Sequence, residues 1–374
     1  VVSVQVGDTE LPRERAALYE ACVKAILQAQ YTPEEGRRQV TDWGGPWEAQ
    51  RDWLCHLAVR MHEGGRAGAA LREEQVKEVL QNINLAEDKV RAFLIASRHR
   101  GGLFEERAEF FQFSHLTFQE FLAARLLAKY REDGRPILQP HVTESWWREV
   151  ALLTYGYLSM ESGDLFVSNS PAVEHLRWLS TLQGSDETRV AGAELAGSSV
   201  LEIEKPDPEQ RLQQARVLVA LLEDKTLAVA GSLRAEAGRT LARLGDPRPG
   251  VGLRADGVPD IAWCPVPAGD FIMGSMDDRE TFYGKETPQH RPTLPAFEIS
   301  QYPITNKQFE AFVQDGGYTT KQWRTCWTKA GLQWKGNRSE PDRYGGVYDL
   351  PNHPAVMVMW YEAVAFCHWL GQKL

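Results

Sequence analysis

The chain has 374 residues, 43% of them hydrophobic and 10% aromatic, which is enough to bury two or three cores and excludes a disordered chain. The formal net charge is −9 without any block of like charges, so nucleic acid is not an expected partner. No apolar run reaches the roughly 18 residues of a membrane span, and the first residues lack the features of a signal peptide. We therefore expect a cytoplasmic protein with no membrane partner. Because the first residues of the chain are typical of the middle of a domain, a targeting segment upstream of them stays an alternative.

The cysteines are odd in number, widely spread and never arranged as C-x-x-C. This usage favours free thiols in a reducing compartment over disulfides or a zinc site. The five are Cys22, Cys55, Cys264, Cys326 and Cys367.

The first hundred residues repeat apolar side chains at helical spacing, which predicts a helical bundle. One helix is expected from 11 to about 30, and three more follow around Leu57, Val79 and Phe93. Alternating phenylalanines near Phe111 then predict a short β-hairpin.

Thr117 stands three residues before Glu120, which is the spacing of a capping box at the start of a further helix. Helices, a small β-wing and a capped helix together describe a winged-helix-like module. His115, beside the wing, is either a hydrogen-bonded structural residue, which we favour, or a nucleotide contact.

The string Phe-Gln-Phe-Ser-His-Leu-Thr-Phe-Gln-Glu-Phe-Leu-Ala-Ala-Arg, residues 111–125, resembles the segment that follows the nucleotide-binding core of NACHT-type STAND NTPases, the NLR-like family. The resemblance covers roughly residues 8–160. The chain has no G-x-x-x-x-G-K-[ST] phosphate loop, so no ATPase activity is assigned to it. The resemblance implies that ATP or ADP would bind in an NTPase core upstream of this sequence.

Residues 165–250 contain pairs of Ala/Leu/Arg-rich helices. The last of these helices is predicted to stop at Gly245. The string 233–248 looks like a HEAT-like repeat, with an ordinary helical linker as the alternative.

The composition changes near residue 250, where tryptophan, tyrosine, glycine and proline become frequent. Five ordered blocks follow, at 263–275, 286–292, 297–313, 352–356 and 360–370. They resemble the formylglycine-generating enzyme (sulfatase-modifying factor) family, which implies its irregular, C-type-lectin-like α+β fold. Apart from the resemblance, Thr305 is expected to cap a helix, and residues around Trp360 to form a buried one.

The predicted fold class is therefore multidomain: mostly α, with a helical bundle, a winged-helix-like module and HEAT-like helices, followed by the irregular α+β domain. The expected domains are 1–160, a helical connector at 161–252, and a formylglycine-generating-enzyme-like domain at 253–374 that is incomplete at its C-terminal end.

Catalytic machinery is the point at which the sequence departs from that family. The resemblance implies a copper-binding cysteine pair well downstream of Trp360, which this sequence does not contain, and Cys367 is expected to be a core residue. The iron-binding H-x-x-x-H-x-E pattern of the related sulfoxide synthases is also absent. The histidines His290, His353 and His368 lie in separate blocks, so we predict no catalytic, cofactor-binding or metal residues.

The segment from 318 to 348 is aromatic and polar without period, which favours a long surface loop suited to ligand contact. The expected ligand-binding residues are Trp323, Trp327, Trp334 and Tyr344.

Three functions stay open. The first is the sensor portion of an NLR-like STAND protein, whose partners are upstream NTPase and effector domains. Its lectin-like domain would bind a protein or other macromolecular ligand, as hypervariable, retroelement-diversified binding proteins do. The second is a formylglycine-generating-type oxidase that uses copper through residues beyond this sequence. The third is a non-catalytic scaffold for self-assembly.

Overall fold

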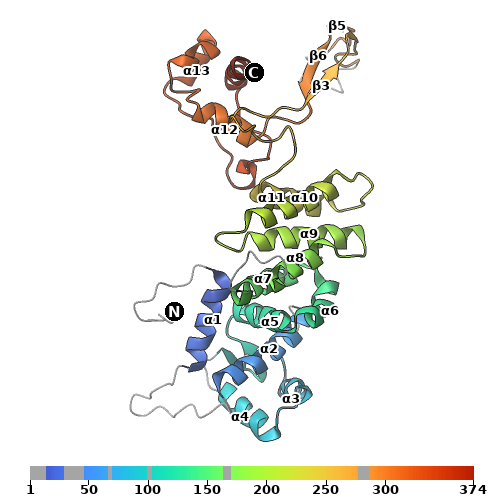
Figure 1. Cartoon of the computed structure of the whole chain (residues 1–374), viewed down its shortest axis with the longest axis vertical. Helices are drawn as coiled ribbons and strands as arrows, with labels where there is room; N and C mark the ends of the chain where they lie inside the picture. The colour runs from blue at the N-terminus through green and yellow to red at the C-terminus, as the bar shows by residue number, and fades with distance from the viewer. Residues whose placement is uncertain (1–13, 29–45, 66–69, 99–102, 163–169, 277–286) are drawn as a thin grey trace. The chain divides into compact units, whose positions relative to one another are not determined.

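The computed structural model describes residues 14–28, 46–65, 70–98, 103–162, 170–276 and 287–374. The chain divides into two compact units, Val1–Leu244 and Gly245–Leu374, each with its own apolar core. The first unit is mostly helical, and the second combines short helices with small antiparallel sheets (Figure 1). The predicted multidomain fold class is confirmed. None of the described helices is long and apolar enough to cross a membrane.

The first unit begins with helices and a hairpin in the order expected for a winged helix. The strands pair antiparallel with Phe104 opposite Phe113, and a bridge from Leu71 to Phe111 extends the wing. The apolar residues at helical spacing, among them Leu57 and Phe93, are fully buried. The elements are α1 (Arg15–Gln28), α2 (Trp47–Glu63), α3 (Glu73–Asn82), α4 (Glu87–Ser97), β1 (Phe104–Arg107) and β2 (Phe110–Phe113).

Helix α5 (Leu116–Tyr130) packs between α2 and α7 (Arg148–Ser162) and carries the centre of the first core. The predicted capping box of Thr117 and Glu120 is wrong. The helix begins at Leu116, so Thr117 lies inside its first turn and the N-cap is His115, which makes no side-chain cap.

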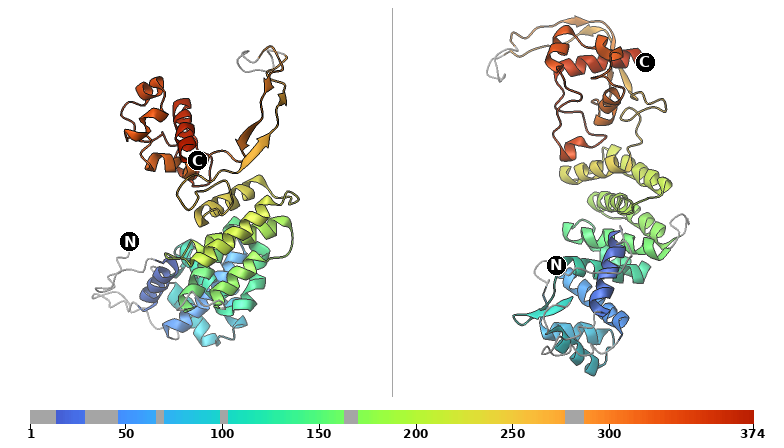
Figure 2. Two further views of the ribbon diagram at one scale, coloured as in Figure 1. Left: turned by 45° about the horizontal axis from the view of Figure 1, so that its top comes forward. Right: turned by 90° about the vertical axis from the view of Figure 1, so that its left-hand side faces the viewer.

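Three later helices of the first unit start at side-chain caps. The side chain of Ser170 accepts from Val173 N, that of Ser185 from Thr188 N, and that of Asp207 from Glu209 N. Helix α9 contacts α8, α10 and α11, which explains why it is buried on nearly every side (Figure 2). These elements are η2 (Arg131–Gly134), α6 (Arg135–Leu138), η3 (Gln139–His141), η4 (Ser145–Trp147), α8 (Pro171–Ser180), α9 (Asp186–Val200), α10 (Pro208–Glu223) and α11 (Gly231–Leu244).

The second unit combines a two-part β-ribbon with helices that enclose an aromatic core. Thr305 caps α12 as predicted, because its hydroxyl accepts from Gln308 N while the Gln308 side chain accepts from Thr305 N. The ribbon is β3 (Trp263–Val266) with β6 (Phe297–Ser300) and β4 (Gly269–Asp270) with β5 (Thr293–Leu294). The helices are α12 (Asn306–Gln314), η6 (Gln322–Cys326), α13 (Lys329–Lys335), η7 (Gly346–Asp349) and α14 (Trp360–Lys373).

Candidate ligand surface

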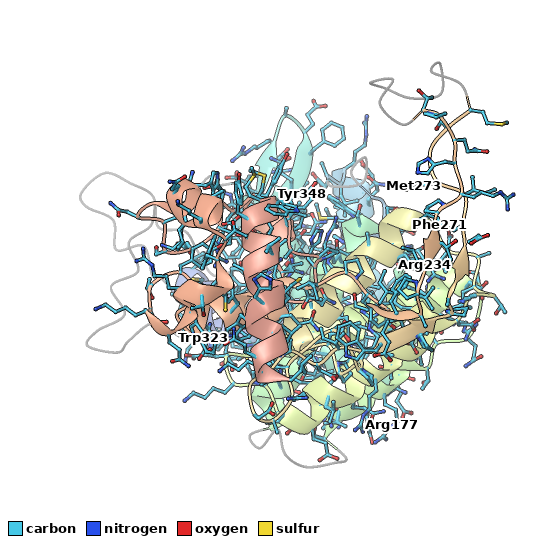
Figure 3. All side chains as sticks on the ribbon, turned by 90° about the horizontal axis from the view of Figure 1, so that it is seen from above. Arg177, Arg234, Phe271, Met273, Trp323 and Tyr348 are labelled. Carbon is cyan, nitrogen blue, oxygen red and sulfur yellow. The ribbon has the colours of Figure 1, made fainter. Side chains whose placement is uncertain are left out.

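Two of the four residues predicted to touch a ligand belong to the core of the second unit. Trp323 and Trp327 are each 5% exposed, and their indole N–H groups donate to Asp315 O at 2.9 Å and Gly317 O at 2.8 Å. Trp323 lies against α14, where its ring is 6.5 Å from that of Trp369 (Figure 3). The expectation of a long surface loop is therefore corrected at these two positions: η6 and α13 fold the segment back onto α14.

The other two predicted residues, Trp334 and Tyr344, are accessible. Trp334, on α13, is half-buried between Tyr361, at 5.8 Å between ring centroids, and the guanidinium of Arg338, 4.6 Å above its ring. Tyr344 is 66% exposed, and its ring centroid is 5.0 Å from that of Tyr348. The structure thus places the two in separate ring pairs.

Tyr344 belongs to a short exposed segment that we call the Tyr344 segment, residues 344–348. It carries two adjacent glycines at positive φ, which allow the chain to turn and present its side chains outward. Tyr348 is 44% exposed and stacks edge-on against His353, and Asn306 holds the segment by donating to Tyr348 O at 2.6 Å. The double glycine was the sequence signal that could have located Tyr348.

Further exposed apolar side chains lie at the entrance to α14, where sequence reasoning expected a buried helix. Trp360 is 66% exposed, and Met357 and Met359 are each 48% exposed. Met357 also adopts a φ of 61°, which a side chain with a Cβ rarely takes. Strained non-glycine backbone of this kind is common at binding sites.

Cys367 is not the core residue that the sequence suggested, because it lies on the exposed side of α14. The buried side is set instead by Ala365, Phe366, Trp369 and Leu370. Cys326 is the buried thiol of this unit; Gln372 Nε2 lies 3.4 Å from its sulfur, and burial raises its pKa.

The three histidines that could suggest a metal site use their rings locally. Each Nδ1 lies within hydrogen-bond distance of a backbone carbonyl: His290 of Pro288 O, His353 of Pro354 O, and His368 of Cys326 O. Over the described ranges, no group of three or more His, Cys, Asp or Glu side chains could hold a metal ion.

His115 in the first unit is exposed at the N-terminus of α5, with its ring 6.1 Å from that of Phe118. We find no hydrogen bond of this ring to any part of the chain that the structure describes, so the favoured interpretation as a hydrogen-bonded structural residue lacks support.

Comparison with known proteins finds one family model that matches within each unit. The family model of the winged helix-turn-helix domain C-terminal to NACHT matches residues 15–127. The model of the sulfatase-modifying factor enzyme 1-like domain matches residues 259–374. The chain therefore joins a NACHT-associated winged-helix domain to a formylglycine-generating-enzyme-like domain.

Individual relatives match part of the chain. Hercynine oxygenase from Mycobacterium tuberculosis is 32% identical over 118 residues, which cover 28% of this chain and 27% of that protein. Formylglycine-generating enzyme from Bos taurus is 29% identical over 143 residues, 31% of this chain and 37% of that protein. The enzyme of the same name from Thermomonospora curvata is 31% identical over 136 residues, 29% of this chain and 44% of that protein. The chain thus spans less than half the length of these relatives.

Proposed function

We propose that this chain is the sensor portion of an NLR-like STAND signalling protein, and that its formylglycine-generating-enzyme-like unit binds a protein ligand rather than converting a substrate. The observation that carries the proposal is the presence of a NACHT-associated winged helix and this unit in a single chain. We infer that this winged helix is part of a two-state switch. A ligand shifts such a switch only through differential affinity for its two states.

The exposed aromatic side chains of the second unit support a binding role. Tyrosine and tryptophan provide large contact areas with few rotatable bonds, and they are enriched where proteins meet. The Tyr344 segment and Trp334 offer such side chains from separate places, and Trp334 adds a stacked cation in Arg338. We infer that the ligand contacts Tyr344 and Tyr348 and that Trp334 extends the surface.

The wider assembly follows from the same proposal. The chain would act in the cytoplasm with an upstream NTPase core that binds ATP or ADP, with effector domains, and with further copies of itself. Its second unit would use a C-type-lectin-like fold as a rigid support for variable binding loops. Under this proposal His115, which is exposed at the start of α5, would contact a nucleotide in that core.

A peptide selection tests the binding role. The 374-residue chain is immobilised and used to select a displayed random peptide library, and selected peptides are synthesised for equilibrium titration. We expect Tyr344→Ser and Tyr348→Ser each to weaken binding about tenfold or more, as loss of a central aromatic contact does. Tyr130→Ser, at a tyrosine of the first unit that is 39% exposed, is the matched control and should bind as the unchanged chain does. Equal binding by all variants would show that the ligand does not contact the Tyr344 segment.

An oxygenase is the second candidate, favoured by the 32% identity to a hercynine oxygenase over 118 residues. Under this alternative the complete protein oxidises a sulfur-containing substrate with copper or iron. The described residues supply no cluster of three or more metal ligands for such an ion, so we assign no step to this chain. Conversion of a cysteine-containing peptide by the purified chain in the presence of oxygen and copper would favour the enzyme.

A further inference from the structure

One stretch of the second unit carries only positive charge. Residues 316–339 contain five basic side chains and neither aspartate nor glutamate, in a chain whose formal net charge is −9. The stretch comprises η6, α13 and the turns beside them, and both of these elements pack against α14. The five basic residues are Lys321, Arg324, Lys329, Lys335 and Arg338.

These five cations differ from their neighbours in lacking ion pairs. Arg343, a little later in the chain, pairs with Glu310 at 2.8 Å, and Lys373 on α14 pairs with Asp315 at 2.9 Å. Over the described ranges, no carboxylate lies within salt-bridge distance of any of the five. The stretch therefore presents positive charge that a partner can neutralise.

Three of the five cations gather at the end of α13. Burial and the charge of Arg324 lower the pKa of Lys335, so these two like charges lie close enough to repel each other. Lys335 Nζ donates to Arg338 O at 3.2 Å, and the Arg338 guanidinium lies 4.6 Å from the ring centroid of Trp334. Arg338 Nη1 also donates to Trp334 O at 3.1 Å, which holds the guanidinium in place and leaves its other N–H groups for a ligand.

A row of aromatic rings continues from these cations. The ring centroid of Trp334 is 5.8 Å from that of Tyr361, which is 5.4 Å from that of Trp360. Trp360, at the start of α14, is 66% exposed. Tryptophan and arginine are enriched among the residues that dominate binding between proteins. We call the following set the basic-aromatic surface: Arg324, Trp334, Lys335, Arg338, Trp360 and Tyr361.

The charge of the basic-aromatic surface decides which class of partner fits it. Carboxylates pair with guanidinium and ammonium groups, and an exposed ring beside them can pack against an apolar side chain. Nucleic acid fits less well, because its phosphate backbone needs a broad positive footprint. Here two exposed carboxylates, Glu340 and Asp342, follow closely after Arg338 and would repel such a backbone.

We propose that the basic-aromatic surface docks an acidic segment of a partner protein, whose carboxylates pair with Lys335 and Arg338 while an apolar side chain packs on Trp360. This inference rests on the protein-binding role proposed above and names the chemistry of the ligand. Trp334 then serves by holding the Arg338 guanidinium in place.

Two displayed peptide libraries of equal length and diversity test this chemistry. One varies among aspartate, glutamate and apolar residues, and the other has lysine and arginine in place of the acidic residues. Both are selected on the immobilised 374-residue chain, and selected peptides are titrated at low and at high ionic strength. We expect enrichment from the acidic library alone, and binding that weakens as the salt concentration rises.

Neutral variants locate the contacts of a selected acidic peptide. Lys335→Gln and Arg338→Gln should each weaken binding about 2- to 5-fold, as loss of an exposed ion pair does. Trp360→Ser should weaken it about tenfold or more. Arg60→Gln, at an exposed arginine of α2, is the matched control and should bind as the unchanged chain does.

A change in the peptide makes the test independent of the folding of any variant. The selected peptide is compared, on the unchanged chain, with a counterpart in which each carboxylate is replaced by its amide. We expect the amide peptide to bind about 3- to 30-fold more weakly, as loss of two or three exposed ion pairs implies.

Equal enrichment from the two libraries, or equal affinity of the selected peptide and its amide counterpart, would overturn the proposal. So would a short oligothymidylate that displaces the peptide and binds more tightly, since the partner would then be a nucleic acid. If neither charged library yields a binder but the random library does, the binding role stands and this surface does not carry it. If no library yields a binder, the binding role itself fails, and this inference with it.

Discussion

Glu362 is a carboxylate buried to 1% exposure in the aromatic core of the second unit. It accepts from the Tyr318 hydroxyl at 2.6 Å and from Met359 N at 2.7 Å. Burial and the carboxylate together raise the pKa of Tyr318, so its hydroxyl stays protonated and continues to donate. We predict that Tyr318→Phe lowers the free energy of unfolding by about 1.5–3 kcal/mol, the range for a hydrogen bond to a charged group.

Urea unfolding followed by tryptophan fluorescence measures that loss. Tyr302→Phe is the matched control, because among the described residues the hydroxyl of Tyr302 accepts one exposed hydrogen bond, from Gln301 Nε2 at 3.4 Å. We expect a change within about 0.5 kcal/mol. Equal changes in the two variants would mean that the buried bond to Glu362 contributes nothing specific.

Glu120 gives the first unit a pH dependence. Burial and repulsion from Glu149, partly offset by Arg15, raise its pKa to about 7 in the folded chain. Between the ordinary carboxyl pKa and about 7, the folded state therefore binds more protons than the unfolded state, and stability falls as pH rises through this window. Since Glu120 is partly exposed, we expect Glu120→Gln to be about 1 kcal/mol more stable than the unchanged chain at pH 8, and nearly equal to it at pH 4.5.

Urea unfolding at both pH values checks the sign of this effect. Glu78→Gln, at an exposed glutamate of α3, is the control: its free energy of unfolding should differ from that of the unchanged chain by the same amount at both pH values. A Glu120→Gln variant that is less stable than the unchanged chain at pH 8 would show that the Glu120 carboxylate is stabilised, not repelled, by its surroundings.

At the scale of elements, a buried ion pair joins α7, α9 and α11. Arg148 Nη2 donates to Glu194 Oε1 at 2.9 Å, and Ser198 and Thr240 each donate to the same oxygen at 2.7 Å. Glu194 is 2% exposed, so removal of its cation leaves a buried charge. We predict that Arg148→Met destabilises the first unit by about 2–4 kcal/mol.

The double variant Arg148→Met with Glu194→Gln separates charge from packing. It removes the buried charge and keeps an amide that can accept from Ser198 and Thr240, so we expect it to regain at least half of the lost stability in urea unfolding. A double variant no more stable than Arg148→Met alone would indicate that the arginine acts through its packing.

Amphipathic elements could be predicted from the sequence because their period is encoded locally. The helices around Leu57, Val79 and Phe93 and the Thr305 cap are found as predicted. The start of α5 was missed, since it depends on how the hairpin delivers the chain to Leu116. The burial of Trp323 has no periodic signal because it comes from a 3₁₀ turn folded onto α14.

The candidate sites were harder to predict, for a physical reason. Tyr344 could be singled out as an aromatic residue in an aperiodic stretch, but its pairing with Tyr348 depends on a local turn.

At the scale of the whole molecule, the two units have separate cores and should unfold as separate cooperative units. We predict two transitions in calorimetry: Arg148→Met lowers the midpoint of one, and Tyr318→Phe lowers the midpoint of the other. Because Arg148 and Tyr318 belong to different cores, the double variant should show both midpoint shifts, each of the same size as in the single variant. A single transition moved by either substitution would show that the units unfold together.

The central claim is that the second unit binds its ligand without converting it. The most direct test incubates a selected cysteine-containing peptide with an equal amount of the 374-residue chain, oxygen and copper(I), and then measures the mass of the recovered peptide. The account predicts a peptide that binds the unchanged chain, binds the Tyr344→Ser variant more weakly, and is recovered with its mass unchanged. Recovery of a peptide oxidised at its cysteine, in an amount that grows with the protein added, would contradict it and identify the unit as an oxidase.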